Sequence, residues 1–152
     1  MPKPWQKFAT LLRVRERQER LKAQALASAR REVERAQIQR DALAEEQRLL
    51  LEEAGTASRE HVDAHKTQSL ILYERHIARL AVDKDAEIHG LKSVAEKRRA
   101  ELEESMKRRK VVERLDERER VNYRNHVMHE EQKLLDETAS VQSALERKAD
   151  RA

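Results

Sequence analysis

The sequence contains no cysteine and has only two glycines, two prolines and four aromatic residues. Without cysteine, the chain forms no disulfide framework and performs no thiol chemistry. The scarcity of aromatic residues and turn formers argues against a rounded hydrophobic core. No apolar run approaches the about 20 residues that a membrane span needs, so we expect no direct membrane insertion. These absences together predict a soluble, cytoplasmic protein.

Charge is what the sequence has in abundance, since 41% of its 152 residues are charged. Such a composition is typical of long solvated helices. The net charge of +4 is unevenly distributed along the chain. Residues 1–31 hold nine basic and two acidic residues, whereas residues 32–54 hold three basic and seven acidic ones. The basic start of the chain is suited to steering an acidic partner, although a charge run is equally compatible with a solvated helix face.

The clearest interruption of the helical pattern is the run Ala54-Gly55-Thr56-Ala57-Ser58. Gly55 can adopt the left-handed backbone angles that end a helix, and Thr56 or Ser58 can cap the next one. Two helices joined by a short polar break tend to fold back on each other. The sequence therefore predicts an all-α fold, a long two-helix antiparallel coiled-coil hairpin. We expect a single coiled-coil domain over 1–152, with a first arm over about 5–54, a turn over about 55–66 and a second arm over about 67–149.

Apolar residues recur at steps of three and four along both arms, as expected for helices with one apolar stripe. In the first arm the predicted stripe is Phe8, Leu11, Val14, Leu21, Ala25, Ala29, Val33, Ala36, Leu43 and Leu50. Its two consecutive steps of four, from Ala25 to Val33, depart from a strict heptad and should locally unwind the supercoil. In the second arm the predicted stripe is Leu70, Tyr73, Ile77, Leu80, Ile88, Leu91, Val94, Leu102, Met106, Val112 and Leu115. Gly90 lies within this stripe and permits a kink there.

The two predicted arms have unequal lengths. With a turn centred near residue 60, Phe8 lies opposite about residue 112, so about 40 residues of the second arm extend beyond the first. The stripe continues along this extension at lower density, through Tyr123, Val127, Leu134, Thr138, Val141 and Leu145. An apolar stripe on a lone helix is expected to dock against something outside the hairpin. The partner is either another protein or the same segment of a second copy.

The sequence offers little support for catalysis or metal binding. His61 and His65 are four residues apart, and His126 and His129 are three apart, which places each pair on one helix face. Neither pair has further ligands at an obvious spacing, so we interpret them as solvent-exposed histidines. A two-helix hairpin also provides no concave substrate pocket, and no glycine-rich phosphate loop is present. We expect a protein that is not an enzyme and has no cofactor, no metal and no catalytic residue.

Two basic clusters, residues 97–99 and 107–110, raise the question of nucleic-acid binding. Clustered cations neutralise phosphates, but acidic residues are interleaved here and no aromatic residue is available for base stacking. An acidic groove of a protein partner explains such a basic stretch equally well. We therefore expect no nucleic-acid partner.

Three segments resemble the FliJ/YscO family of type III export proteins. The opening Leu11-Leu12-Arg13-Val14-Arg15-Glu16-Arg17-Gln18-Glu19 is similar to the start of that family's first helix. Residues 113–118, Glu-Arg-Leu-Asp-Glu-Arg, and residues 131–139, Glu-Gln-Lys-Leu-Leu-Asp-Glu-Thr-Ala, resemble its C-terminal signature. The resemblance covers both arms and nearly the whole chain.

The resemblance implies an antiparallel coiled coil similar to the central shaft of rotary ATPases. It also implies a non-enzymatic stalk or adaptor that inserts into the hexameric type III export ATPase and links it to the cytoplasmic domain of the export gate protein. Export chaperones are a further class of partner in the family. The implied location is cytoplasmic and peripheral, at the inner face of the cytoplasmic membrane. A flagellar and a virulence export system remain equally compatible with the resemblance.

The resemblance also implies which residues meet these partners. The candidates for binding the ATPase are Phe8, Leu11, Leu12, Arg13, Tyr123, Val127, Glu131, Gln132, Lys133, Leu134, Asp136 and Glu137. The candidates for binding the export gate are Tyr73, His76, Ile77 and Leu80, for which packing between the two arms is the alternative role. Two other functions stay open at this point: a homodimeric coiled-coil scaffold and, less favoured by the charge pattern, a basic rod that binds nucleic acid.

Overall fold

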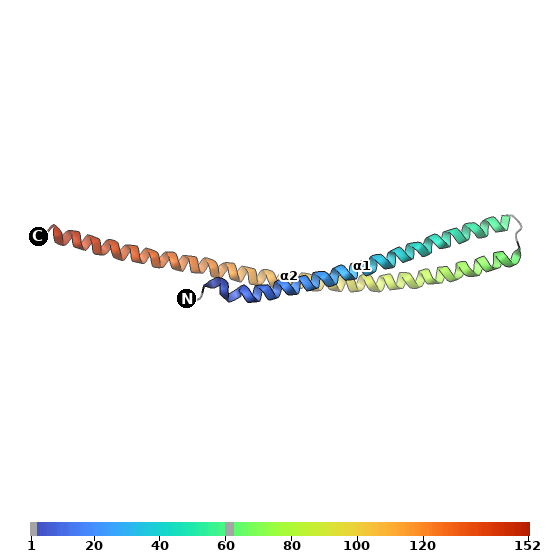
Figure 1. The fold of residues 1–152 in the computed structure, drawn as a ribbon, viewed down its shortest axis with the longest axis horizontal. Coiled ribbons are helices and arrows are strands. Elements are labelled where there is room, and N and C mark those ends of the chain that lie inside the picture. The colour runs from blue at the N-terminus through green and yellow to red at the C-terminus, as the bar shows by residue number, and fades with distance from the viewer. Residues whose placement is uncertain (1–2, 60–62) are drawn as a thin grey trace. The chain divides into compact units, whose positions relative to one another are not determined.

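The computed structural model describes residues 3–59 and 63–152. The described residues form two helices, α1 (Pro4–Arg59, 56 residues) and α2 (Ala64–Ala149, 86 residues), and no strand (Figure 1). The two helices pack against each other, which confirms the predicted all-α helical hairpin. Whether the chain is a single domain stays a prediction.

The connection between the helices is shorter than the sequence predicts. Residues 55–59, expected in the turn, continue α1, and residues 64–66 already belong to α2. The centre of the predicted turn, residues 60–62, lies outside the described residues. Glycine inside a helix costs only about 1 kcal/mol relative to alanine, so Gly55 alone does not end α1, and Ala57 two residues later is buried.

The start of α2 is defined by Asp63 rather than by Thr56 or Ser58. Its side-chain Oδ1 accepts a hydrogen bond from the backbone N–H of His65 at 3.2 Å. Its backbone carbonyl accepts hydrogen bonds from the N–H groups of Lys66 and Thr67. Asp63 thus supplies acceptors for the free N–H groups of the first turn, as an N-cap does. Thr56 instead donates its hydroxyl hydrogen to the carbonyl of Glu52 within α1.

The packing divides the chain into two compact units, which we describe separately. The hairpin unit is Arg20–Glu104, and the terminal unit consists of Met1–Glu19 and Ser105–Ala152. In the hairpin unit, Lys22 contacts Glu101 at 3.3 Å, Arg40 donates to Asp85 at 2.7 Å and Gln47 donates to Glu74 at 2.8 Å. Because residue numbers rise along α1 as those of their partners fall along α2, the two helices of this unit are antiparallel.

The seam of the hairpin unit follows a heptad pattern, which is interrupted in α2 at the exposed Arg98 and resumes at the half-buried Leu102. Its seam positions are buried or half-buried and are separated by alternating steps of four and three residues, with Ala25, Glu46 and Ala78 half-buried beside them. In α1 they are Lys22, Leu26, Ala29, Val33, Ala36, Arg40, Leu43, Gln47, Leu50, Ala54 and Ala57. In α2 they are Thr67, Leu70, Glu74, Ile77, Ala81, Lys84, Ile88, Leu91 and Ala95. Such spacing is the repeat of a left-handed coiled coil.

The predicted stripes are therefore wrong in part. Leu21 is 56% exposed and lies outside the seam, whereas Leu26 is 7% exposed and lies in it. Leu11 and Val14 in α1, and Tyr73, Leu80, Val94 and Leu115 in α2, likewise lie on the exposed surface. The predicted steps of four from Ala25 to Val33 do not occur, because the seam runs through Leu26. The error arose from following apolar residues alone, since polar residues such as Lys22 and Arg40 occupy seam positions.

The terminal unit continues the same spacing with a more polar seam. Its α1 positions are Phe8, Leu12, Arg15 and Glu19, and its α2 positions are Ser105, Arg109, Val112, Asp116, Glu119 and Tyr123. Arg109 donates hydrogen bonds both to Glu19 on the other helix and to Glu113 on its own. Lys7 contacts Glu119 at 3.9 Å. Ion pairs thus set the register here, where few large apolar side chains are available.

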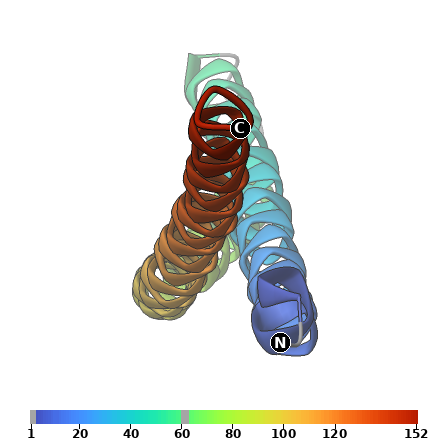
Figure 2. The ribbon, with the colours of Figure 1, turned by 90° about the vertical axis from the view of Figure 1, so that its left-hand side faces the viewer.

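Within the terminal unit, α2 continues alone beyond the start of α1 (Figures 1 and 2). Lys7 pairs with Glu119, and α2 ends at Ala149. The unpaired extension is therefore about 30 residues rather than the predicted 40, because the helices meet about six residues further along α2 than a turn at residue 60 implies. We call residues 124–149 the overhang.

We expect the replacement of Leu26 by alanine to destabilise the hairpin and the replacement of Leu21 to be nearly neutral. Removing a buried leucine costs about 2 kcal/mol or more, whereas a surface change costs less than about 0.5 kcal/mol. Thermal unfolding followed by circular dichroism measures both variants. Equal losses from Leu21→Ala and Leu26→Ala would contradict the seam described above.

We also expect Gly55→Ala and Gly90→Ala to stabilise the chain, each by about 0.5–1 kcal/mol, because both glycines lie inside helices. A Cβ atom at either position meets no atom within 4 Å. Chemical denaturation of the two variants provides the measurement. If Gly55→Ala were destabilising, residue 55 would have to adopt the turn conformation that the sequence suggested.

Candidate docking surfaces

The overhang carries an apolar stripe that is out of phase with the seam. Continuing the alternating steps of three and four beyond Tyr123 leads to His126, Glu130, Lys133, Glu137, Ser140 and Ala144. The apolar residues instead follow at Val127, Leu134, Val141 and Leu145, one residue later in each turn. Two successive steps of four, from Glu119 through Tyr123 to Val127, produce the shift. The stripe therefore changes phase where α1 begins, which indicates that it was not shaped to pair with α1.

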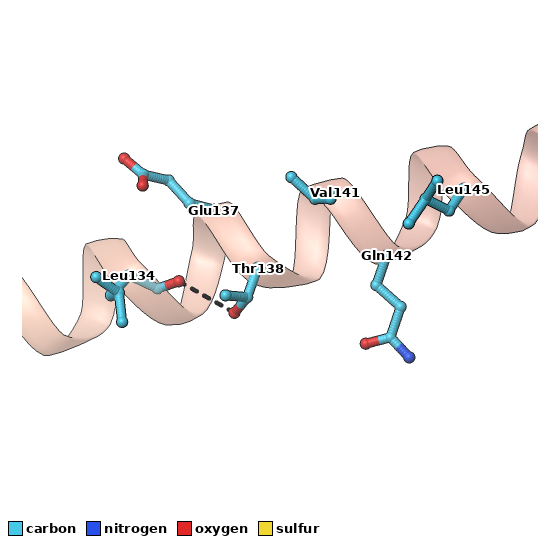
Figure 3. A pocket seen from close by; sticks show the side chains of 6 residues that line it. All are labelled: Leu134, Glu137, Thr138, Val141, Gln142 and Leu145. Atoms are coloured by element: carbon cyan, nitrogen blue, oxygen red, sulfur yellow. Dashed lines mark hydrogen bonds between the residues drawn. The ribbon is translucent and has the colours of Figure 1, made fainter.

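The stripe forms one continuous face of α2, which we call the overhang face (Figure 3). Its residues are Leu134, Glu137, Thr138, Val141, Gln142 and Leu145. The three aliphatic side chains are each 60–66% exposed. Thr138 interrupts them, but its hydroxyl donates to the carbonyl of Leu134 at 3.0 Å and so requires no outside partner. A lone helix that exposes large aliphatic side chains at helical spacing is suited to binding a partner.

The residues around the overhang face are exposed and mostly acidic. Lys133 donates to Glu130 at 3.0 Å, and this hydrogen bond is the main reason that the pKa of Glu130 lies below its usual value. The remaining predicted residues of this stretch, Glu131, Gln132, Asp136 and Glu137, are also exposed. This arrangement provides an apolar centre with a charged border, as many protein interfaces do.

The other predicted ATPase contacts lie at the start of α1. Phe8 and Leu12 are half-buried in the seam, whereas Leu11 and Arg13 are exposed. Tyr123 and Val127 are half-buried, at the point where the pairing with α1 ends. The structure thus places all these candidates in the terminal unit but does not gather them at one spot. Leu134 follows Glu119, the partner of Lys7, by 15 residues, or about 22 Å of helix.

The seam beside Phe8 and Leu12 contains two buried polar atoms that have no hydrogen-bond partner among the described residues. They are Nε of Arg15 and Oδ1 of Asp116. The other oxygen of Asp116 accepts a hydrogen bond from Arg120 at 2.8 Å, and Arg15 donates to Gln18 at 3.2 Å. Each unsatisfied buried polar atom costs about 1–3 kcal/mol, so these two atoms weaken the pairing of α1 with α2 in the terminal unit.

The predicted gate contacts separate into buried and exposed residues. Ile77 is 3% exposed and packs in the seam of the hairpin unit. Tyr73, His76 and Leu80 are exposed and, at spacings of three and four, share one face of α2. The Tyr73 ring stacks on that of His76, with 6.4 Å between the ring centroids. The Tyr73 hydroxyl donates to Glu46 at 2.8 Å, and the carboxylate raises the pKa of that hydroxyl.

The part of the chain that the structure describes contains no candidate metal site and no candidate membrane span. No group of three or more metal-ligating side chains is present among these residues. His65, His126 and His129 are exposed, and His61 lies outside the described residues. None of the described helices is long and apolar enough to cross a membrane.

The apolar extension predicted from the sequence already included Val141 and Leu145, but the candidate ATPase contacts did not extend over the whole overhang face. Thr138, Val141, Gln142 and Leu145 were not among the predicted ATPase contacts, which stopped at Glu137. The signal was present in the sequence, because Val141 and Leu145 continue the spacing set by Leu134. The list of candidates followed the family signature, which ends at residue 139, and whether the later residues bind the ATPase stays a prediction.

The comparisons with known proteins agree with the family resemblance of the sequence. Residues 5–148 match the family model described as flagellar FliJ protein. No curated protein and no solved structure matches the chain. The family match spans nearly the whole of both helices and favours the flagellar branch of type III export. The chain therefore belongs to the flagellar FliJ protein family, whose members are non-enzymatic, and it has a role in flagellar protein export with partners in the export machinery.

Proposed function

We propose that this chain is a stalk and adaptor of the flagellar type III export apparatus, binding the hexameric export ATPase with its overhang and the export gate with its hairpin unit. The observation that carries the proposal is the phase change at Tyr123. The apolar stripe of the overhang begins where α1 has no further residues to pair with α2. It is one residue out of phase with the positions that pack against α1. Membership of the family supports a partner within the export machinery, and the overhang face offers an exposed apolar surface for it.

In the proposed ATPase contact, both the apolar side chains of the overhang face and the charged residues at its border bind the ATPase. A central hole in a ring of subunits admits a single helix or helix pair, and the overhang presents an apolar face bordered by charges to the walls of such a hole. Phe8, Leu11, Leu12 and Arg13 lie further along the terminal unit and belong to the same proposed contact. The weakly satisfied seam at Arg15 and Asp116 would let this part of the pair adapt to its surroundings.

The export-gate contact rests on the exposed residues Tyr73, His76 and Leu80. They present an aromatic stack followed by an aliphatic side chain on one face of α2. Ile77 supports this face from within the seam rather than touching a partner. Binding to the cytoplasmic domain of the gate would hold the protein at the inner face of the cytoplasmic membrane. Export chaperones are a further proposed class of partner, with no surface assigned.

The double variant Leu134→Asp, Val141→Asp is expected to weaken binding to the export ATPase at least about 100-fold and to abolish any stimulation of ATP hydrolysis. Burying two carboxylates in an apolar contact costs several kcal/mol. Helix content should be retained, because both side chains are solvent-exposed in the free chain. Titration of the ATPase and circular dichroism of each variant provide the measurements.

The matched control is Ala139→Asp, Ser143→Asp, which adds the same charge to the opposite side of the overhang. It should retain ATPase binding.

Light scattering on the same samples tests the homodimeric scaffold, because self-pairing through the overhang face would make the wild type a dimer and the first variant a monomer. A dimer of this kind, with unchanged ATPase binding by both variants, would contradict the proposal.

Leu80→Ala is expected to reduce binding to the cytoplasmic domain of the export gate about tenfold or more, as loss of a central aliphatic contact does. Val82→Ala is the control, since Val82 is 67% exposed but lies on another side of α2. Isothermal titration calorimetry measures both. Equal affinities of the two variants would remove Leu80 from the contact.

A further inference from the structure

The terminal unit exposes a group of apolar residues outside both the seam and the overhang. Leu11 and Val14 in α1, and Val111 and Leu115 in α2, are each 40–55% exposed. Val14 follows Leu11 by three residues and Leu115 follows Val111 by four, so each pair shares one face of its helix. These four side chains remain unexplained by the pairing of α1 with α2.

The register places the four residues on the same side of the helix pair. The ion pairs Lys7–Glu119 and Glu19–Arg109 bring Leu11 opposite about residue 115 and Val14 opposite about residue 112. Leu11 and Leu115 each directly precede a seam residue. In the hairpin unit Glu46 and Tyr73 hold the equivalent positions, and their hydrogen bond shows that such positions lie side by side.

Cations border this apolar group. Lys107, Val111, Arg114 and Arg118 recur at steps of four, three and four along α2. On α1, Arg17 follows Val14 by three residues. The basic side chains therefore lie next to the apolar ones on the outer surface of the helix pair. We call Leu11, Val14, Arg17, Lys107, Val111, Arg114, Leu115 and Arg118 the basic patch.

Among the described residues, no acidic side chain forms an ion pair with a cation of the patch. In the paired part of the terminal unit, five of the six acidic residues already form ion pairs, namely Glu19, Glu113, Asp116, Glu117 and Glu119. Arg17, Lys107, Arg114 and Arg118 form no ion pair with any described residue, and neither do Arg13 and Lys110 nearby. The interleaved acids therefore leave a surplus of exposed positive charge on this side.

We propose that the basic patch binds the surface of a membrane containing anionic phospholipids. Exposed lysine and arginine side chains beside short aliphatic ones are the combination that holds helices at a charged bilayer surface, with the cations at the headgroups and the apolar side chains at the acyl boundary. The patch extends along the outer surface of two antiparallel helices that lie side by side, which suits a planar ligand. The inference goes beyond the proposed function, which assigns the chain protein partners only.

The test is flotation of the full chain with phosphatidylcholine vesicles that do or do not contain phosphatidylglycerol, at physiological ionic strength. Wild-type protein should float with the anionic vesicles alone. The triple variant Lys107→Gln, Arg114→Gln, Arg118→Gln should bind about 100-fold more weakly, because each basic residue near an anionic surface contributes about a fivefold gain in affinity. Its helix content, checked by circular dichroism, should be unchanged.

The matched control is Arg30→Gln, Arg31→Gln, Arg35→Gln, which removes three exposed cations of the hairpin unit. It should weaken vesicle binding less than about threefold, because these cations are not part of the basic patch. An equal loss in the control, or no flotation of the wild type, would overturn the proposal. Equally tight binding to duplex DNA, with the same sensitivity to the triple variant, would also overturn it in favour of a general polyanion site.

The triple variant changes no residue of the proposed ATPase and gate contacts. A failure of the proposed lipid contact can therefore be distinguished from a failure of the proposed protein contacts. Loss of vesicle binding with intact ATPase binding supports the basic patch as a lipid site. Loss of ATPase binding by this variant, with vesicle binding unchanged, would assign the patch to an acidic protein partner and overturn the lipid assignment.

Discussion

The unequal length of two paired helices is the constraint on which the rest of the structure depends. A helix pair buries one stripe of each helix, and α1 has 56 residues whereas α2 has 86. About 30 residues of α2 must therefore find a partner elsewhere or remain solvated. The change of phase at Tyr123 shows that the sequence treats this segment differently from the paired one. The shorter helix thus fixes where the intramolecular seam stops and where the proposed intermolecular contact begins.

The seam itself is thin, and polar groups carry much of its register. Among the described residues no large side chain is fully buried, and Lys22, Arg40 and Gln47 occupy positions that a firm coiled coil fills with leucine. Their partners Glu101, Asp85 and Glu74 hold the helices in one alignment. Such partly exposed pairs add little stability but disfavour slipped registers. A helix pair of this kind keeps one alignment but can still bend, which suits the proposed stalk.

The sequence was sufficient to predict two antiparallel helices and the apolar extension, because strong periodicity and unequal arms are local properties. It was insufficient for the seam, since Leu21 and Leu26 are equally apolar and only the partner helix decides which is buried. The turn predicted at Gly55 was wrong because a long helix tolerates a single glycine, and α1 continues through it to Arg59. The residue that caps α2 is Asp63. Among the candidates for binding the export gate, Ile77 is buried and Tyr73 is exposed. This difference likewise depends on how α2 is aligned with α1.

Hydrogen exchange of the full chain, alone and with the export ATPase, tests the central claim most directly. Free protein should exchange its amide hydrogens faster over residues 124–149 than over the hairpin unit, because the overhang is stabilised by no second helix. Addition of the ATPase should slow exchange over residues 124–149, centred on Leu134 to Leu145, and leave the seam around Leu26 and Ile88 unchanged. Unaltered exchange of the overhang in the presence of bound ATPase would contradict the account. Protection of the overhang that depends on the concentration of the chain alone would contradict it as well.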